Sequence, residues 1–175
     1  RNVPDSILVR LKKNGGIVMV TFVPSFVSEK VRQHGLTRAQ HERELTSGFG
    51  GDTARLGAAM VAWDRANPRP PATLKDVADH FDHIRKVAGP DHVGIGGDFD
   101  GVGGDHITGL EDVSTYPDLL AELARRGWTD DELRKVASGN IMRVLAENEK
   151  VAARLQKTRK PSTRTIEELD RVPRM

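Results

Sequence analysis

Two aspartates, Asp98 and Asp100, follow an apolar segment directly and stand among glycines in the sequence GIGGDFDG at residues 94–101. A carboxylate at the end of a parallel strand projects into the cleft where enzymes with this architecture carry out their chemistry. Asp98 is therefore a candidate to bind a substrate ammonium group or to take up and return a proton. A structural explanation competes, since aspartates in glycine-rich turns also accept hydrogen bonds from the amides of their own loop. Spacing alone leaves both explanations open.

The same segment does not fit calcium or dinucleotide binding. Asp98, Asp100 and Gly103 match positions one, three and six of a calcium-binding loop, but Val102 and Gly109 stand at positions five and twelve, where oxygen ligands are needed. A dinucleotide cradle needs a third glycine where residue 99 is phenylalanine. The substrate site and the structural role in the loop therefore stay as the two explanations for these aspartates.

Histidines give weaker indications. His80 and His83 are three residues apart on a predicted helix, but no third ligand stands at a fixed spacing, so we expect capping or solvent contacts rather than a metal site. His106 follows Asp98 in the same loop and is a candidate substrate contact, with a hydrogen bond inside the loop as the alternative. The chain has no cysteine, and no Ser-His-Asp arrangement is visible.

The elements that position these residues alternate between helix and strand. A helix is predicted from Pro4 to a glycine stop after Asn14, and another over 73–88, where Thr73 and Asp76 form a capping box. The apolar runs 17–23 and 92–97 predict strands, the first of them buried on both faces, which favours a parallel sheet. After a glycine-rich loop over 98–115, helices are predicted over 116–126 and from a second capping box at Thr129 onward.

Two further segments differ in composition from this pattern. Residues 28–71 form a polar excursion for which we predict some helix, over 56–63, and residues 157–175 form a charged peripheral tail. We therefore assign residues 1–156 to one domain. The net charge of +2 is small and many of the cations lie in the tail, which argues against nucleic-acid binding. No apolar stretch reaches the roughly 20 residues of a membrane span.

Two strands are too few for a parallel sheet that is covered on both faces. We therefore expect an α/β fold whose remaining strands lie outside this chain, which would begin inside a longer protein. The isolated chain is expected to be poorly stable, because the strand over 17–23 would lack its neighbour.

Five motifs carry a family resemblance. They are RNVPD at 1–5, VMV at 18–20, ADHFDHI at 78–84, GGDFDG at 96–101 and GLEDVSTYPD at 109–118. In this order they resemble the membrane dipeptidase (renal dipeptidase) family of zinc peptidases, from Arg1 to about Val151. The resemblance implies a (β/α)₈ TIM barrel of the metallo-dependent hydrolase type, with two zinc ions and a metal-bound water that cleaves dipeptides. This chain would hold the last two strands and their helices.

The resemblance also implies roles for individual residues. Asp98 would lie beside the metals as the catalytic acid and contact the amino end of the substrate, Arg1 would grip its carboxylate, and Phe26 stands where mammalian members carry a pocket tyrosine. The family's metal ligands, a His-x-Asp, a Glu and two His, belong upstream of Arg1, and none of the six histidines here corresponds to them. The isolated chain is therefore expected to be inactive.

Two other functions remain open at this point. The chain could belong to a barrel that has lost catalysis and acts as a binding protein, or to an amidohydrolase that acts on a non-peptide amide. The expected partners are a dipeptide substrate and the missing N-terminal part of the barrel, with a homodimer as a further possibility. No lipid-anchor signal is evident at the C-terminus, and our working expectation is a soluble, non-animal, cytoplasmic protein.

Overall fold

A two-stranded parallel sheet lies at the centre of the structure, a computed structural model that describes residues 2–169. Strand β1 (Val18–Thr21) pairs with β2 (Val93–Gly97), and the register shifts by one residue after Val20. The amide of Phe22 then donates to the Gly97 carbonyl over 2.7 Å, so the two strands end side by side. The parallel α/β arrangement predicted from the two apolar runs is confirmed.

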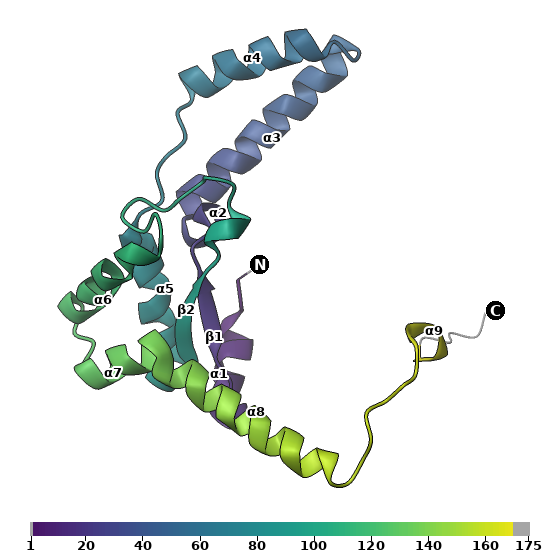
Figure 1. The fold of residues 1–175 in the computed structure, drawn as a ribbon. Helices are drawn as coiled ribbons and strands as arrows, with labels where there is room; N and C mark the ends of the chain where they lie inside the picture. The colour runs from purple at the N-terminus through teal and green to yellow at the C-terminus, as the bar shows by residue number, and fades with distance from the viewer. Residues whose placement is uncertain (1, 170–175) are drawn as a thin grey trace.

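The helices follow the predicted alternation with additions (Figure 1). Those before β2 are α1 (Asp5–Asn14), α2 (Pro24–Val27), α3 (Glu29–Phe49), α4 (Thr53–Ala66) and α5 (Leu74–Val87). Those after it are α6 (Tyr116–Arg125), α7 (Asp130–Arg134), a π-helical turn (Lys135–Gly139), α8 (Asn140–Gln156) and α9 (Ile166–Leu169). Short 3₁₀ turns occupy Pro90–His92, Phe99–Gly101 and Val113–Thr115. Within the described residues no helix is both long and apolar enough to cross a membrane.

Helix α5 links the sheet to the outer helices. It opens with the predicted capping box, in which the amide and the hydroxyl of Thr73 both donate to the Asp76 carboxylate over 2.7 Å. Its apolar face repeats at helical spacing, so Val77 and Phe81 are completely buried. Around them lies the core, which includes Leu8, Phe22, Val93, Ile107, Leu119, Leu123, Trp128 and Val136.

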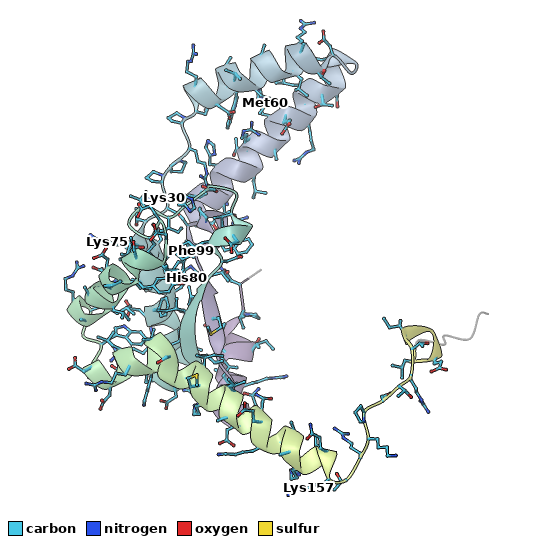
Figure 2. The ribbon with its side chains drawn as sticks, viewed as in Figure 1. Lys30, Met60, Lys75, His80, Phe99 and Lys157 are labelled. Atoms are coloured by element: carbon cyan, nitrogen blue, oxygen red, sulfur yellow. The ribbon has the colours of Figure 1, made fainter. Side chains whose placement is uncertain are left out.

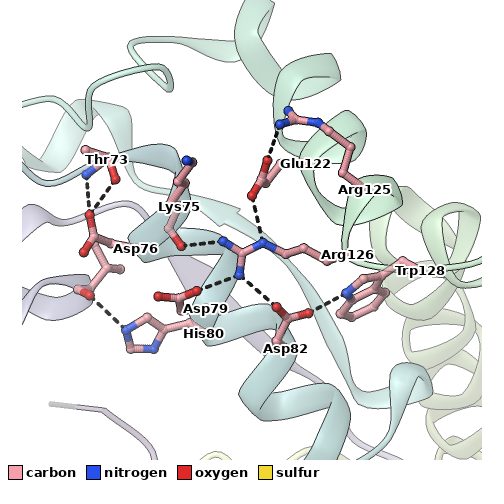
Figure 3. A network of polar contacts seen from close by, with 11 residues as sticks. Thr73, Lys75, Asp76, Asp79, His80, Asp82, Glu122, Arg125, Arg126 and Trp128 are labelled. Atoms are coloured by element: carbon pink, nitrogen blue, oxygen red, sulfur yellow. Dashed lines mark hydrogen bonds and ion pairs between the residues drawn. The ribbon is translucent and has the colours of Figure 1, made fainter.

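The outer face of α5 is joined to α6 by charged groups centred on Arg126 (Figure 3). The guanidinium donates to Asp79 (2.6 Å), Asp82 (2.8 Å) and Glu122 (2.9 Å), and Trp128 also donates to Asp82. Burial opposes the charge of Arg126, but these three hydrogen bonds outweigh it and raise the pKa of the guanidinium. We call these five residues the Arg126 cluster.

Strand β1 differs from its prediction. It was expected to be buried on both faces, yet Val18 is half-buried and Met19 is 36% exposed. The reason is that Val18 and Val20 point to the face that packs on the core, whereas Met19 points to the opposite face of the two-stranded sheet. A cavity of about 540 Å³ lies along β1, lined by Asn2, Val3, Leu8, Val18, Met19, Val20, Thr21, Phe26, Val27, Asp79, His80, His83 and Ile84.

The polar excursion forms a long helical hairpin. Helices α3 and α4 extend together away from the sheet (Figure 1) and contact each other through His34 and His41, whose rings pack on Trp63. Arg38 adds a two-pronged ion pair to Asp64 over 2.8 and 3.0 Å. The helix predicted over 56–63 lies inside α4, whereas the 21-residue α3 was not predicted in detail, because its sequence is polar on most faces.

The C-terminal helices are held against the start of β2. Thr129 and Glu132 form the second predicted capping box at the start of α7. The π-helical turn then brings Asn140, which is 2% exposed, under β2, where its amide donates to the carbonyls of Pro90 (2.7 Å) and Val93 (2.9 Å). These bonds satisfy backbone acceptors next to the strand and fix α8 to the sheet.

Candidate functional site

The chain turns sharply at the C-terminal end of β2. Gly97 has a φ of 66° and Asp98 a φ of 74°, so two successive residues take the left-handed conformation. Among the described residues that are not glycine, Asp98 is alone in this region. Left-handed backbone costs roughly 1–2 kcal/mol for an L-residue and is tolerated best by Asn and Asp. Such local strain is concentrated at functional sites, because the surrounding structure must hold it in place.

The carboxylate of Asp98 is exposed and accepts no capping hydrogen bond from the following turn. It lies directly over Gly101, where a Cβ atom would collide with it. The main chain closes the same turn, with the Gly101 amide donating to the Asp98 carbonyl over 3.2 Å. The missing side chain of Gly101 therefore leaves room for the Asp98 carboxylate, which stays exposed to solvent and available to a ligand.

Two other acids of the loop take the structural role considered above for Asp98 and Asp100, in which a carboxylate accepts a hydrogen bond from a loop amide. Glu111 accepts the amide of Gly109 over 2.8 Å, and Asp112 accepts the amide of Ser114 over 2.7 Å. Hydrogen bonds from Ser114 lower the pKa of the Asp112 carboxyl. Glu111 and Asp112 therefore stabilise the loop, whereas Asp98 has no such partner within the described part of the chain.

Three aromatic side chains pack together near the C-terminal ends of the two strands. Phe22, Phe99 and Tyr116 pack against one another with ring centres 5.7 to 6.0 Å apart, and Figure 2 shows Phe99 at the end of β2. The Tyr116 hydroxyl lies 2.8 Å from the position that a Cβ on Gly97 would take, and burial raises the pKa of the Tyr116 hydroxyl. Gly97 is thus required both by its φ and by the tyrosine above it. The sequence analysis placed Tyr116 on a helix but did not assign it to this group.

The other candidate substrate contacts are spread around this end of the sheet. Phe26, on α2 after β1, lines the cavity along β1, and its carbonyl accepts the Asn2 side chain over 2.9 Å. His106 is exposed in the loop after β2, and its charge contributes to the lowered pKa of Asp112. Arg1 lies outside the described residues. Phe26 and Asp98 therefore each follow one of the two paired strands, and Asp98 is not among the residues that line the cavity beside Phe26.

The two histidines of α5 have protein partners. His80 Nε2 lies 3.2 Å from the Val27 carbonyl, and His83 Nε2 lies 2.7 Å from an Asp5 carboxylate oxygen. Across residues 2–169 no group of three or more His, Cys, Asp or Glu side chains could hold a metal ion. The residues present therefore do not fit a zinc site by themselves, and we derive no chemical step through zinc here.

Parallel strands covered by helices, with a strained acid and aromatic side chains at their C-terminal ends, define an α/β protein with an enzyme-type site. A family model described as membrane dipeptidase (peptidase family M19) matches residues 1–159. The chain belongs to this family, as the five motifs indicated.

Individual relatives agree with the family. Dipeptidase 3 of Rattus norvegicus is 44% identical over 150 residues, which are 86% of this chain and 22% of that protein. The crystal structure of the probable dipeptidase PvdM from Pseudomonas aeruginosa superposes with a TM-score of 0.62 at 26% identity, covering 82% of this chain and 40% of that one. A metallopeptidase from Rhodobacter sphaeroides, bound to a phosphinate mimic of the dipeptide L-Ala-D-Ala, has a TM-score of 0.53 at 26% identity and covers 80% of this chain and 29% of its own. The chain thus spans well under half the length of these relatives.

Proposed function

We propose that this chain forms the substrate-binding end of a metal-dependent dipeptidase site, with Asp98 as its catalytic acid. One observation carries the proposal: Asp98 is held in a strained backbone at the end of β2, with an exposed carboxylate that lacks a capping partner. Family membership supplies the reaction class, since the matched relatives are dipeptidases and metallopeptidases. In this role Asp98 binds the substrate ammonium and accepts or returns a proton at the reacting centre.

We infer that the substrate is a dipeptide with both ends free. The exposed carboxylate of Asp98 suits an ammonium group, and Arg1, which precedes the first described residue, is proposed to bind the carboxylate end. The phosphinate in the Rhodobacter sphaeroides structure mimics L-Ala-D-Ala, so this dipeptide is a suitable first substrate. Phe26 and His106 are proposed as neighbouring contacts that tune side-chain preference.

We further propose that the two strands are the last two of a (β/α)₈ barrel and that two zinc ions are held by residues outside the described chain. The support is the open edge of β1, the cavity beside it and the share of PvdM that the chain covers. The intact mass of the native polypeptide tests this part. A mass near 19.3 kDa, the mass of this chain alone, would contradict it, whereas a much larger mass with a His-x-Asp upstream is expected.

The reaction class is tested with the zinc-loaded native polypeptide and three kinds of substrate. We expect hydrolysis of L-Ala-D-Ala and L-Ala-L-Ala, little hydrolysis of the N-acetylated dipeptide, and none of cyclic amides. Turnover of cyclic amides alone would identify an amidohydrolase. Tight dipeptide binding without turnover would identify a non-catalytic binding protein. A cytoplasmic location and a homodimer stay predictions.

A further inference from the structure

The linker between the hairpin and α5 lies against the loop that carries Asp98. Three prolines in the sequence NPRPP at residues 67–71 restrict the linker to extended conformations. Its end pairs with the loop through the backbone, because the Thr108 amide donates to the Ala72 carbonyl and the Leu74 amide donates to the Thr108 carbonyl, each over 2.9 Å. The excursion is therefore attached to the loop after β2 as well as to the sheet.

A second attachment is a two-pronged ion pair between Arg69, in the middle of the linker, and Asp105, which we call the fork. The guanidinium of Arg69 donates to both carboxylate oxygens of Asp105, over 2.5 and 2.7 Å. This planar two-pronged geometry fixes orientation as well as distance, which a single ammonium contact would not do. Asp105 directly precedes His106, so the fork holds the part of the loop that carries this candidate substrate contact.

At its start the loop is also held by Phe99, which packs on Phe22 and Tyr116, but the residues that follow have few contacts. Gly103 and Gly104 have φ values of 57° and 89°, and a Cβ on either would meet no atom within 4 Å. Of the hydrogen bonds that residues 98–106 form within the described part of the chain, those other than the fork stay inside the loop, such as Asp105 N to Val102 O at 2.9 Å. The fork is thus the hydrogen-bonded connection of this segment to the rest of the fold.

We propose that Arg69 is a positioning residue, which acts through Asp105 to hold the loop from Asp98 to His106 in its binding conformation. The α3–α4 hairpin then has a role in the site, since its linker brings the one Arg or Lys that forms an ion pair with these loop residues in the described structure. The part of this proposal that concerns substrate binding rests on the proposed function. The part that concerns loop order does not.

The chain offers a matched control inside the same hairpin. Arg38 makes the same two-pronged contact with Asp64, and the side chains of the two pairs are similarly exposed, 38% and 43% against 42% and 44%. Exposed ion pairs contribute little to stability, so Arg69→Ala and Arg38→Ala are expected to melt alike. A difference between the two variants in the behaviour of the loop then reflects where the ion pair lies rather than a change in overall stability.

The experiment measures amide hydrogen exchange in the native polypeptide that contains this chain. Arg69→Ala is expected to speed exchange at the hydrogen-bonded amides of Gly101 and Asp105 by about two- to fivefold, the factor that corresponds to a pair of this strength, while Arg38→Ala leaves it unchanged. Arg69→Lys is expected to lie between, because it keeps the charge and loses the fork. The exchanged pair Arg69→Asp with Asp105→Arg is expected to restore slow exchange.

Dipeptide kinetics provide the second readout. Arg69→Ala is expected to raise KM several-fold more than it lowers kcat, since the loop contacts substrate but the reacting groups stay in place. Equal loop exchange in Arg69→Ala and Arg38→Ala would overturn the proposal, as would an unchanged KM alongside faster exchange. If the wild type hydrolyses no dipeptide, the proposed function fails, while the exchange result still decides whether Arg69 orders the loop.

Discussion

The carboxylates of the Arg126 cluster and those at the end of β2 belong to the same protein but have opposite surroundings. Asp79, Asp82 and Glu122 all contact one guanidinium within 2.9 Å, and Glu122 is 6% exposed. Asp98 is exposed, sits on strained backbone and has no capping bond. Paired acids join helices α5 and α6, whereas Asp98 contributes strain and, among residues 2–169, forms no compensating ion pair.

The difference between the Arg126 cluster and Asp98 shows which acid lowers the stability of the fold. An acid that has a cation beside it stabilises the native state above its own pKa, so the Arg126 cluster is explained by folding alone. Asp98 is not explained that way, since a glycine at its position would relieve the strain. A residue that costs stability and keeps its charged group open to solvent is expected to act on a ligand.

The largest expected effect is on activity, from Asp98→Asn. Asparagine also tolerates left-handed backbone, so the turn is preserved while the charge and the proton acceptor are lost. We expect kcat/KM for L-Ala-D-Ala in the zinc-loaded native polypeptide to fall by roughly a thousandfold, with melting temperature and zinc content unchanged. Asp100→Asn, which alters an equally exposed neighbouring acid, is the control and should change kcat/KM less than about tenfold. Comparable losses in both variants would remove the special role of Asp98.

The second effect is on stability, from Arg126→Ala. This change leaves three carboxylates without their shared donor and is expected to cost about 2 kcal/mol or more of unfolding free energy. Denaturant titration measures it, with Arg134→Ala as the control, because the Arg134 pair with Asp131 is 73% and 85% exposed and should matter little. An equal response of the two variants would mean that the Arg126 cluster is not a stabilising centre.

The third effect tests the backbone beneath Asp98 through Gly97→Ala. The new methyl group meets left-handed φ and the Tyr116 hydroxyl at 2.8 Å, so we expect a loss of about 1–3 kcal/mol. Adding Tyr116→Phe removes the hydroxyl and should recover part of the loss in thermal melts. If the double variant is no more stable than Gly97→Ala alone, the tyrosine does not pack on the glycine as described.

The smallest effect is a pH dependence at Glu122. Its hydrogen bond to Arg126, helped by the charges of Arg125 and Arg126, lowers the pKa of the Glu122 carboxyl. A lowered folded-state pKa gives stability that is fully present above the ordinary glutamate pKa of about 4.3 and is lost as pH falls through the folded value. The difference in melting temperature between wild type and Glu122→Gln should therefore be largest near pH 7 and shrink below about pH 4. A difference that stays constant with pH would contradict this assignment.

Local signals predicted much of the fold correctly. Both capping boxes, at Thr73 and Thr129, formed as expected because they need only residues within one helical turn. The two apolar runs became parallel strands, although the first is shorter than predicted and partly exposed. The long helix α3 was not predicted in detail, because the hairpin is held by contacts between distant residues such as Arg38 and Asp64.

The candidate site was predicted in part. Asp98 stood out because a strand end followed by glycine and aspartate is a local pattern, and the family motifs supported it. Tyr116 and Arg69 were not assigned to the site, since they lie 18 and 29 residues away from Asp98 in the sequence. The roles of Arg1, Phe26 and His106 stay predictions, and Arg1 lies outside the described residues.

The sequence by itself determined the alternation of helix and strand, the acid at the end of β2 and the family, because each depends on neighbouring residues or on short motifs read in order. Only the tertiary structure decided which acids pair with a cation and which stay exposed to solvent. Glu122 and Asp105 each meet an arginine, whereas Asp98 meets none among residues 2–169. A carboxylate's role depends on the charges within a few ångströms of it, and chain folding brings those charges from distant parts of the sequence.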